Sequence, residues 1–483
     1  MKRKPSTYTI RSSRRDKMAN LLGVDVGTTS AKMVLFDENG NVLKSVSKEY
    51  SLETKGDTVE LDPEKYWQMF SEGYAEIKSE YTVDALSVDT QCETLIVADE
   101  SGTPLYNAIV WLDNRATLQA EKISERFGTK TVYEVTGQPE ITATWPACKL
   151  MWLRENEPEV FAKTKKIFLL EDFLLYRLTG EFVTERTLQS SSLYLDIRNG
   201  GWWQEMLEFI GISEACLPRL CGSGELLGTY GNTKVVTGVM DQVAGSVGAG
   251  VVTPSVVSEM TGTTMAIVVP TDKFPPYKED SRVPCHINYD GNYCLLTWTP
   301  TAGIALKWFK ENFCENLSFR QLDEIAKEVT PGSNGLIFMP YLCGSIIPKY
   351  NPDARGAFLG LTMEHTRAHA VRAILESVAF MLRENLEYLN VSCSEIRSMG
   401  GGASSPLWCQ IKADVTGKKI VTLKSRESAC LGSAIIAGVG AGVYASVPEA
   451  CKKLIATDKE YYPSGADYSD VYKRYLKCEE ENV

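Results

Sequence analysis

The chain has 483 residues, of which 44% are hydrophobic and 23% are charged, and its formal net charge at pH 7 is −11. This length predicts two or more domains, and this composition excludes an intrinsically disordered protein. The acidic balance argues against a nucleic-acid-binding protein, which normally presents a basic face, but it still allows a local site for an anion.

The cysteines and histidines give little sign of a metal site. Thirteen cysteines stand singly without a CxxC pair, which favours reduced thiols in a cytoplasmic protein over disulfides or zinc. His365 and His369 have the spacing of a metal pair on one helix face. No HExxH pattern surrounds them, so ordinary polar residues are the favoured interpretation. No apolar run is long enough to span a membrane, and we expect no membrane partner.

Residues 1–19 form a basic extension that we expect to be disordered. No apolar segment follows the basic residues, so the extension does not have the form of a secretory signal. We expect Met18 to be the natural initiator.

The first domain, expected at residues 20–249, begins with a strand, turn, strand, turn and strand, and 37–41 supply an Asn-Gly hairpin turn. A helix with Pro63 in its first turn follows. Two buried strands are then expected, at 83–90 and within 93–105.

The second domain, expected at residues 250–483, repeats part of this pattern. Residues 255–269 predict two strands around a Thr-Gly-Thr-Thr turn. A GGG loop at 400–402 separates a strand from a helix that begins near Pro406, and a helix of small residues that can pack very closely, "ESACLGSAIIAGVGAGVY", comes after it. Because strands alternate with helices, we predict an α/β fold.

The turns at 27–29 and 262–264 both have the sequence Gly-Thr-Thr. Their backbone N–H groups and hydroxyls are suited to hold a triphosphate from opposite sides of a cleft. Asp25 is suited to a hydrated Mg²⁺, which takes only one or two carboxylates, and Lys32 adds a cation. Taken alone, either Gly-Thr-Thr turn is explained about equally well by chance and by phosphate binding. No Walker A sequence is present, which excludes a P-loop protein.

Asp241 follows a predicted strand and precedes a helix of small residues. Two interpretations remain open here. The carboxylate is either a helix N-cap, or a base that accepts the proton of a substrate hydroxyl during phosphoryl transfer. The GGG loop permits a close approach to a flat ligand such as adenine, although most such loops are simply turns.

Five segments in this order resemble the FGGY family of carbohydrate kinases: "GVDVGTTSAK", "GVMDQ", "MTGTT", "GGGASSPLWCQIKADVTGKKI" and "GAFLGLTMEHTRAHAVRAILE". The last departs at Ala370, where a larger aliphatic residue is usual. The resemblance runs from about Leu21 to about Tyr444. It implies two actin-like (ribonuclease H-like) domains with an ATP cleft between them, ATP and Mg²⁺ as cofactors, and a small-molecule sugar or polyol substrate. It leaves the oligomeric state open, with a homodimer as one option.

The resemblance also implies roles for individual residues. Asp241 is implied as the general base, and Asp25 with Asp241 as the metal-linked carboxylates. The implied cofactor contacts are Gly27, Thr28, Thr29, Lys32, Thr261, Gly262, Thr263, Thr264, Gly303, Gly400, Gly401, Gly402 and Ala403. The implied substrate contacts are Gln91, Cys92, Glu93, Trp111, Trp145, Asp241 and Gln242.

The substrate is less defined than the reaction. Glycerol kinases place an arginine where this chain has Cys92, which cannot donate comparably, and xylulokinases carry a methionine-histidine pair where it has Cys92 and Glu93. The segment around Trp145 is more similar to the xylulokinase branch, although an aromatic residue there is equally explained as core. D-xylulose is the best single candidate, with glycerol or another polyol or ketose as the alternative. Asp113 and Arg115 are either site residues or a structural ion pair.

Two other classes of protein share the implied fold. One is an ATP-binding regulator without catalysis, which the presence of Asp25 and Asp241 argues against. The other is an actin-like ATPase without a sugar substrate, which would hydrolyse ATP in the absence of any sugar.

Overall fold

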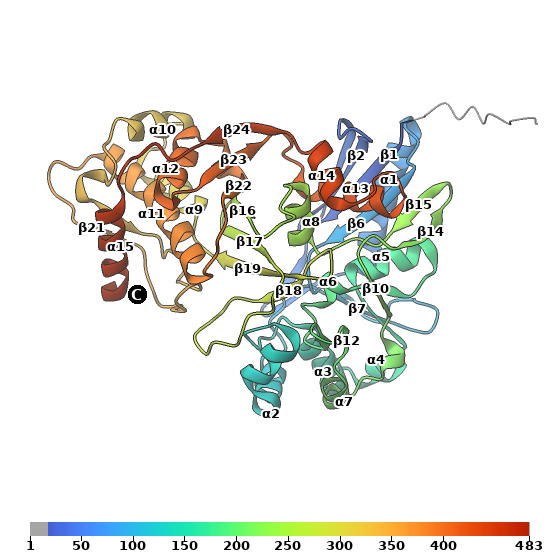
Figure 1. Ribbon diagram of the computed structural model, residues 1–483. Helices are drawn as coiled ribbons and strands as arrows, with labels where there is room; N and C mark the ends of the chain where they lie inside the picture. The colour runs from blue at the N-terminus through green and yellow to red at the C-terminus, as the bar shows by residue number, and fades with distance from the viewer. Residues whose placement is uncertain (1–17, 483) are drawn as a thin grey trace, which may run out of the picture.

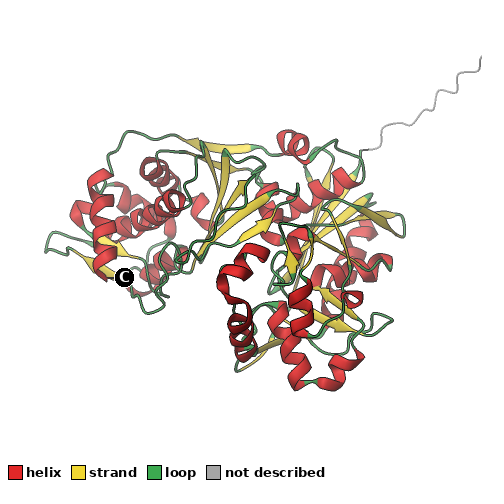
Figure 2. Cartoon of the chain, turned by 60° about the horizontal axis from the view of Figure 1, so that its bottom comes forward, coloured by secondary structure: helices red, strands yellow, loops and turns green. Residues whose placement is uncertain are grey.

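The structure is a computed structural model that describes residues 18–482. The predicted disorder of the basic extension therefore lies outside the described residues, except for Met18 and Ala19. Figure 2 shows two lobes, each with strands at its centre and helices around them. Within the described range, no helix combines the length and the apolar character that a membrane span requires.

The first lobe is built on a six-stranded sheet in the order β14-β15-β6-β1-β2-β3. The strand-turn-strand pattern and the helix at Pro63 are confirmed, as are the buried strands β6 and β7. Apolar side chains of β1, β2, β6 and α1 form the core of this lobe. Its elements are β1 (Asn20–Val26), β2 (Ser30–Asp37), β3 (Val42–Glu49), α1 (Pro63–Glu80), β6 (Ala85–Thr90), β14 (Leu226–Tyr230), β15 (Thr233–Val236) and α8 (Asp241–Gly248).

A second, five-stranded sheet in the order β4-β5-β8-β7-β9 lies beside the first, with helices around it at the bottom of Figure 1. This part of the chain also forms two small two-stranded sheets, β10-β13 and β11-β12. Its elements are β4 (Glu53–Lys55), β5 (Thr58–Leu61), β7 (Leu95–Ala98), β8 (Ala108–Ile109), α2 (Thr117–Thr136), α3 (Pro146–Asn156), α4 (Pro158–Lys163), β9 (Lys166–Leu169), α5 (Leu170–Thr179), β10 (Val183–Glu185), α6 (Arg186–Gln189), β11 (Leu195–Asp196), β12 (Gly201–Trp202), α7 (Gln204–Ile210), η1 (Glu214–Cys216) and β13 (Arg219–Cys221).

The second lobe is built on a seven-stranded sheet in the order β18-β19-β17-β16-β22-β23-β24. As predicted, β16 and β17 form a hairpin around the second Gly-Thr-Thr turn. Its elements are β16 (Val256–Thr261), β17 (Met265–Thr271), β18 (Cys285–Ile287), β19 (Tyr293–Thr299), α9 (Gly303–Phe313), α10 (Phe319–Lys327), η2 (Ser333–Gly335), β20 (Ile337–Met339), β21 (Ala357–Leu359), α11 (Arg367–Tyr388), β22 (Glu395–Met399), η3 (Gly401–Ser404), α12 (Pro406–Thr416), β23 (Lys419–Leu423), β24 (Thr457–Tyr461) and α15 (Ser469–Asn482). The remaining two helices, α13 (Ser428–Gly440) and α14 (Val447–Leu454), belong to the first lobe.

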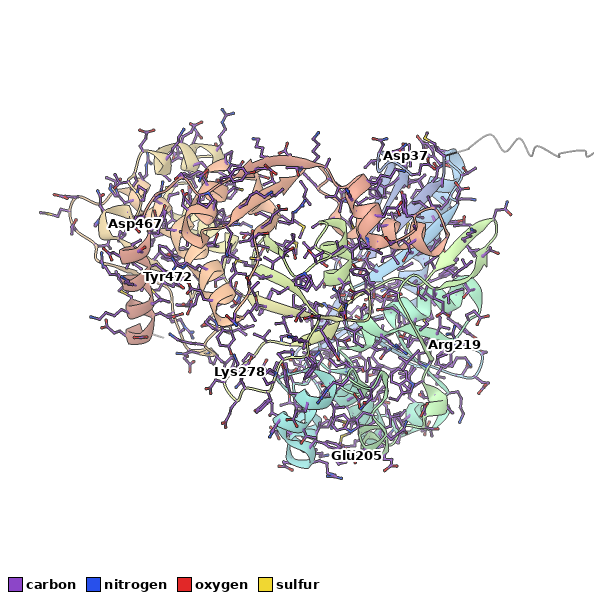
Figure 3. All side chains as sticks on the ribbon, in the orientation of Figure 1. Asp37, Glu205, Arg219, Lys278, Asp467 and Tyr472 are labelled. Carbon is purple, nitrogen blue, oxygen red and sulfur yellow. The ribbon has the colours of Figure 1, made fainter. Side chains whose placement is uncertain are left out.

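The connection between β17 and β18 extends from the second lobe toward the first. Lys278 lies along it (Figure 3), and the Lys278 amino group lies 5.5 Å from the ring centre of Tyr388. At its end the N–H of Cys285 donates to the carbonyl of Gly137, 2.9 Å away. The two lobes are therefore joined by backbone contacts as well as by the chain itself.

After β23 the chain returns to the first lobe, where α13 packs beside β1 and β2, and α14 packs against α13 and α8 (Figure 1). Helix α13 is the predicted helix of small residues, and its close packing has a steric basis. A Cβ atom on Gly432 would lie 1.9 Å from the carbonyl oxygen of Ala244 in α8. This approach brings α13 against the helix that carries Asp241. The predicted domain boundary at residue 250 stays a prediction.

We expect Gly432→Ala to destabilise the protein by about 1–3 kcal/mol, because the two helices must move apart to admit a methyl group. Gly245→Ala is the matched control, since a Cβ on that α8 residue would meet nothing within 4 Å. It should be neutral or stabilising by up to ~1 kcal/mol through helix propensity. Thermal unfolding of both variants checks this, and equal melting temperatures would contradict the steric explanation.

Candidate functional site

Three carboxyl groups meet at the end of the first sheet. Asp25 in β1 and Asp89 in β6 are paired across neighbouring parallel strands, and Asp241 is the first residue of α8. Burial, then the charge of Asp241, raises the pKa of Asp25 to about 6. Burial, then the charge of Asp25, raises the pKa of Asp89 well above its usual value. The sequence pattern singled out Asp25 and Asp241 but missed Asp89, because only strand pairing places it beside Asp25.

Buried acids hold the backbone that leads to Asp241. The N–H of Gly238 donates to Glu171 at 2.9 Å, and the N–H of Met240 donates to the hydroxyl of Thr187 at 2.7 Å. That hydroxyl in turn donates to Glu185 at 2.6 Å. These bonds fix the chain just before the helix, so the position of Asp241 depends on groups far away in the sequence.

The N-cap interpretation of Asp241 is not what the structure shows. Met240 occupies the N-cap position and Asp241 is the first helical residue. Its Oδ1 accepts the N–H of Gln242 at 2.8 Å and the thiol of Cys92 at 3.4 Å. Burial raises the pKa of Asp241 to about 6, while these two hydrogen bonds oppose the rise. The Asp241 carboxylate, which is half-buried, is therefore ionised near pH 7.5.

The buried acids make stability depend on pH. Burial raises the pKa of Asp172 to about 8 and that of Glu185 to about 7. Both values exceed those of the unfolded chain, so the folded protein binds more protons between about pH 5 and pH 8, and stability is lost as the pH rises through this window. We expect a larger free energy of unfolding at pH 6.5 than at pH 8.

Urea unfolding at these two pH values, with wild type and Asp172→Asn, checks this expectation. A fully titrating group contributes about 1.4 kcal/mol per pH unit. The variant lacks one such group and should show a smaller difference between the two pH values. A wild type that is more stable at pH 8, or a variant with an unchanged difference, would contradict this interpretation.

Glu93 lies beside Cys92 and Asp241 with an unusual backbone. Its φ is +68°, a left-handed conformation that is uncommon outside glycine and tends to mark functional sites. Burial raises the pKa of Glu93 to about 8, although the positive charge of Lys149 opposes the rise. Lys149, fully buried in α3, donates to the carbonyl of Val110 at 3.0 Å. The sequence interpretation missed Lys149, although a lysine inside the apolar run "WPACKLMWL" was its signal.

Three other predicted substrate contacts, Trp111, Trp145 and Gln91, each make a hydrogen bond within the protein. Trp111 is 37% exposed, and its indole N–H donates to the hydroxyl of Thr28 at 3.1 Å. The indole N–H of Trp145 donates to the carbonyl of Glu140 at 2.9 Å. Gln91 is buried under the first hairpin and donates to Tyr66 at 3.1 Å.

Asp113 and Arg115 form a structural ion pair, one of the two interpretations left open. The Arg115 guanidinium lies 2.6 Å from Asp113, whose carboxylate also accepts the N–H of Val59 at 2.6 Å. Asp113 is fully buried, so this pair anchors the chain after Trp111.

A cavity of about 810 Å³ lies between the second hairpin, the GGG loop and the helices α9 and α10. Ile304, Leu306, Phe319 and Trp408 give it an apolar wall. The sequence interpretation missed Ile304, Leu306 and Phe319, which lie outside the five quoted segments, whereas Trp408 belongs to the GGG segment. Six predicted cofactor contacts line it: Thr261, Gly262, Thr263, Gly303, Gly401 and Gly402. Its size and its mixed apolar and polar lining are those of a small-molecule site.

The second hairpin is anchored from below by a buried ion pair. The amino group of Lys412 lies 2.9 Å from Glu259, and both side chains are fully buried. The same amino group donates to the hydroxyl of Thr261 at 3.0 Å. Gly400, at φ +74°, lets the GGG loop pass over this point, because a Cβ there would lie 2.6 Å from the carbonyl of Thr261. The side chain of Thr261 thus faces the ion pair, while Gly262 and Thr263 are exposed.

The first hairpin and the remaining predicted contacts lie outside this cavity. Lys32 pairs with Glu427 at 2.5 Å, which links β2 to the start of α13. Gly400 and Ala403 line a neighbouring cavity. Three predicted contacts belong to the hairpin turns themselves, Gly27, Thr29 and Thr264, which each take part in a backbone hydrogen bond there.

Within residues 18–482, no three or more His, Cys, Asp or Glu side chains are arranged to hold an ion by themselves, Asp25, Asp89 and Asp241 included. His369 contacts the amide of Asn334 at 3.1 Å, and His365 accepts the N–H of Thr362 at 2.9 Å. This agrees with ordinary polar roles. All thirteen cysteines are free in the structure, and their reduced state in the cell stays a prediction.

Comparison with known proteins now identifies the family. Models of the N-terminal and C-terminal domains of the FGGY family of carbohydrate kinases match residues 20–256 and 221–441. The chain belongs to the FGGY family of carbohydrate kinases. The xylulose kinase of Bacillus subtilis (strain 168) is 31% identical over 94% of this chain and 96% of that protein. The gluconokinase of the same strain is also 31% identical, over 88% of this chain and 87% of its own length.

A solved FGGY structure agrees with the fold. The ligand-bound xylulose kinase from Lactobacillus acidophilus superposes with a TM-score of 0.88 at 27% identity, covering 96% of this chain and 98% of that one. The predicted class, α/β with two actin-like domains, is confirmed. The protein is a sugar kinase with ATP as its phosphate donor, so the prediction of a kinase is confirmed.

Proposed function

We propose that this FGGY kinase transfers the γ-phosphoryl group of ATP to a hydroxyl of a ketose or polyol, with D-xylulose as the best single candidate. The observation that carries the proposal is the half-buried carboxylate of Asp241, which lies beside Cys92 at the end of the first sheet. Similarity to xylulose kinases supports D-xylulose. Glycerol, gluconate and other polyols are the alternatives, and the gluconokinase relatives favour gluconate among them.

In this proposal Asp241 accepts the proton of the substrate hydroxyl as the phosphoryl group moves across. A general base is most effective when its pKa lies near the working pH, and burial sets that of Asp241 at about 6. Glu93, with a pKa of about 8, is protonated near neutral pH and donates a hydrogen bond to a sugar oxygen. Trp111 and Trp145 cover apolar faces of the sugar, and Gln91, Cys92 and Gln242 complete the proposed contacts.

Mg²⁺ is proposed to lie near Asp25, Asp89 and Asp241. The residues fit the ion, because burial, followed by the charge of a neighbouring carboxylate (Asp241 for Asp25, and Asp25 for Asp89), raises their pKa values, and a cation would offset that charge. In addition, Oδ1 of Asp89 is buried and has no hydrogen-bond partner within the described chain. Mg²⁺ offsets phosphate charge and keeps most of its water ligands.

The cavity beside α9 and α10 is proposed to hold the adenosine of ATP, with the adenine against its apolar wall. Gly262 and Thr263 then contact the phosphates from one side, and Gly27, Thr28, Thr29 and Lys32 contact them from the other after the lobes close. Closure excludes water, so transfer to the sugar is favoured over hydrolysis. Thr264 and Ala403 support these turns. We further propose a cytoplasmic enzyme without nucleic-acid or membrane partners, either monomeric or homodimeric.

The proposal is tested by measuring sugar-dependent ADP release with ATP and Mg²⁺. The panel consists of D-xylulose, L-xylulose, D-ribulose, L-ribulose, erythritol, glycerol and gluconate. We expect D-xylulose to give the highest kcat/KM. If a compound that is not a ketose gave the highest kcat/KM, that compound would replace D-xylulose as the proposed substrate. ATP hydrolysis that responds to no member of the panel would contradict a ketose or polyol acceptor altogether.

A further inference from the structure

A second cavity, of about 710 Å³, lies on the other side of the GGG loop. It opens at the carboxyl ends of the parallel strands β22 and β23, where ligands of open α/β sheets usually bind. Gly401, Ser404 and Pro406 line both this cavity and the proposed nucleotide cavity. The loop is therefore a shared wall between two separate spaces.

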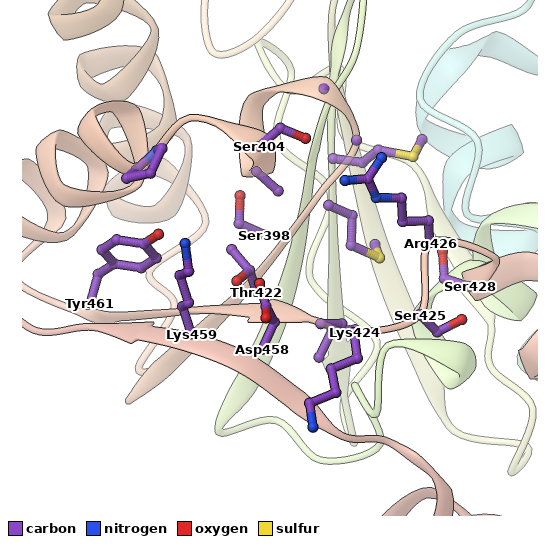
Figure 4. A pocket seen from close by; sticks show the side chains of 17 residues that line it. Ser398, Ser404, Thr422, Lys424, Ser425, Arg426, Ser428, Asp458, Lys459 and Tyr461 are labelled. Atoms are coloured by element: carbon purple, nitrogen blue, oxygen red, sulfur yellow. The ribbon is translucent and has the colours of Figure 1, made fainter. Parts of the chain in front are cut away.

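The second cavity carries an excess of positive charge. Lys424, Arg426 and Lys459 line it, and Asp458 is its one lining carboxylate. Lys459 projects from β24, and Arg426 lies across the cavity from it (Figure 4). No ion pair or side-chain hydrogen bond engages these three cations within residues 18–482. This cluster therefore retains its capacity for an anion.

The hydroxyl of Thr422, which is buried without a partner in the described chain, also indicates that the cavity binds a ligand. Thr422 is 4% exposed and lines the cavity, and its Oγ1 has no hydrogen-bond partner within the described chain. Leaving such a group unsatisfied costs about 1–3 kcal/mol, so native proteins rarely do so without a reason. A ligand oxygen in the cavity would satisfy it.

Strand register places these groups in one row. Ser398 in β22 is paired with Thr422 in β23, and Thr422 is paired with Lys459 in β24. Residues paired across neighbouring strands share a face of the sheet, so the row presents two hydroxyls and an ammonium group to the cavity. The hydroxyl of Ser398 already donates to Glu259 at 2.7 Å, which leaves Thr422 and Lys459 for a ligand.

We propose that this cavity binds the phosphate group of a small phosphorylated metabolite, at a site separate from the catalytic cleft. Three cations against one carboxylate leave a net charge of two, which matches a phosphate monoester dianion. Arg426 and Lys459 contact the phosphate, and Thr422 donates its free hydroxyl to a ligand oxygen. Because the GGG loop borders both cavities, binding here changes the affinity for nucleotide, and nucleotide changes the affinity here by the same factor.

The test is isothermal titration calorimetry of the full chain saturated with ADP, with D-ribose 5-phosphate as the probe and D-ribose as its uncharged control. We expect one site with a Kd below about 1 mM for the phosphate and none for D-ribose. Arg426→Gln and Lys459→Gln should each weaken binding about tenfold, the cost of one lost charge-assisted hydrogen bond. Asp458→Asn should tighten binding, because it removes the one repelling charge.

Two further variants separate a specific site from general charge effects. Thr422→Val keeps the shape of the side chain and should weaken binding through loss of the hydroxyl. Lys452→Gln removes an exposed lysine of α14 that does not line the cavity, and should leave binding unchanged. The proposal would be overturned if D-ribose 5-phosphate did not bind, or if ADP abolished its binding. It would also be overturned if substitution of Arg426, Lys459 and Asp458 left the affinity unchanged. The measurement needs no sugar phosphorylation, so its outcome is independent of the proposed substrate.

Discussion

Asp241→Asn is expected to lower kcat for sugar phosphorylation by about 10²–10⁴-fold, the usual contribution of a general base. The amide keeps the size of the carboxylate and still accepts the N–H of Gln242, so the start of α8 is preserved. It cannot take a proton from the substrate hydroxyl. Steady-state kinetics with the preferred sugar, together with calorimetric titration of ATP, measures the two effects separately.

The control for this variant is Asp57→Asn, which changes an exposed carboxylate in the turn between β4 and β5. We expect it to retain wild-type kcat. The thermal stability of Asp241→Asn should be unchanged or slightly higher, because the wild-type carboxylate is ionised in a half-buried position beside other acids. Near-normal turnover in Asp241→Asn with intact ATP binding would show that another group is the base.

Lys412→Met is expected to have the largest effect on stability, about 3–5 kcal/mol, because it leaves the buried carboxylate of Glu259 without its counter-ion. Lys412 donates to both oxygens of Glu259, at 3.0 and 2.9 Å, and to Thr261 at 3.0 Å. The variant should also weaken ATP binding, since Thr261 begins the second hairpin. Urea unfolding measures the first effect and calorimetry the second.

Two controls make the cause of that loss clear. Lys327→Met changes an exposed lysine of α10 and should alter stability by less than about 0.5 kcal/mol. The double variant Glu259→Gln with Lys412→Met removes both charges and should recover more than half of the loss, because no isolated charge stays buried. A double variant as unstable as Lys412→Met would show that packing, not charge, is what Lys412 provides.

Local sequence was sufficient for several elements near the site. The two Gly-Thr-Thr turns are hairpins, because glycine and short polar residues between apolar runs favour tight turns. Asp241 begins a helix of small residues, as the local sequence predicted, and the second predicted helix of small residues packs closely against it at Gly432. The order of five short segments was enough to identify the family, since each segment is continuous in the chain.

The tertiary structure decided what lies around those segments. Asp89 joins Asp25 through strand pairing, and Lys149 reaches the backbone of Val110 across 39 positions of sequence. Burial, which no local pattern measures, sets the pKa values of Glu93 and Asp241. The row of Thr422 and Lys459 depends on the register of β23 and β24. The sequence therefore determined the turns, the helix with its leading carboxylate and the family. Contacts between distant segments, and the burial they create, decided the charge state of the site and the second cavity.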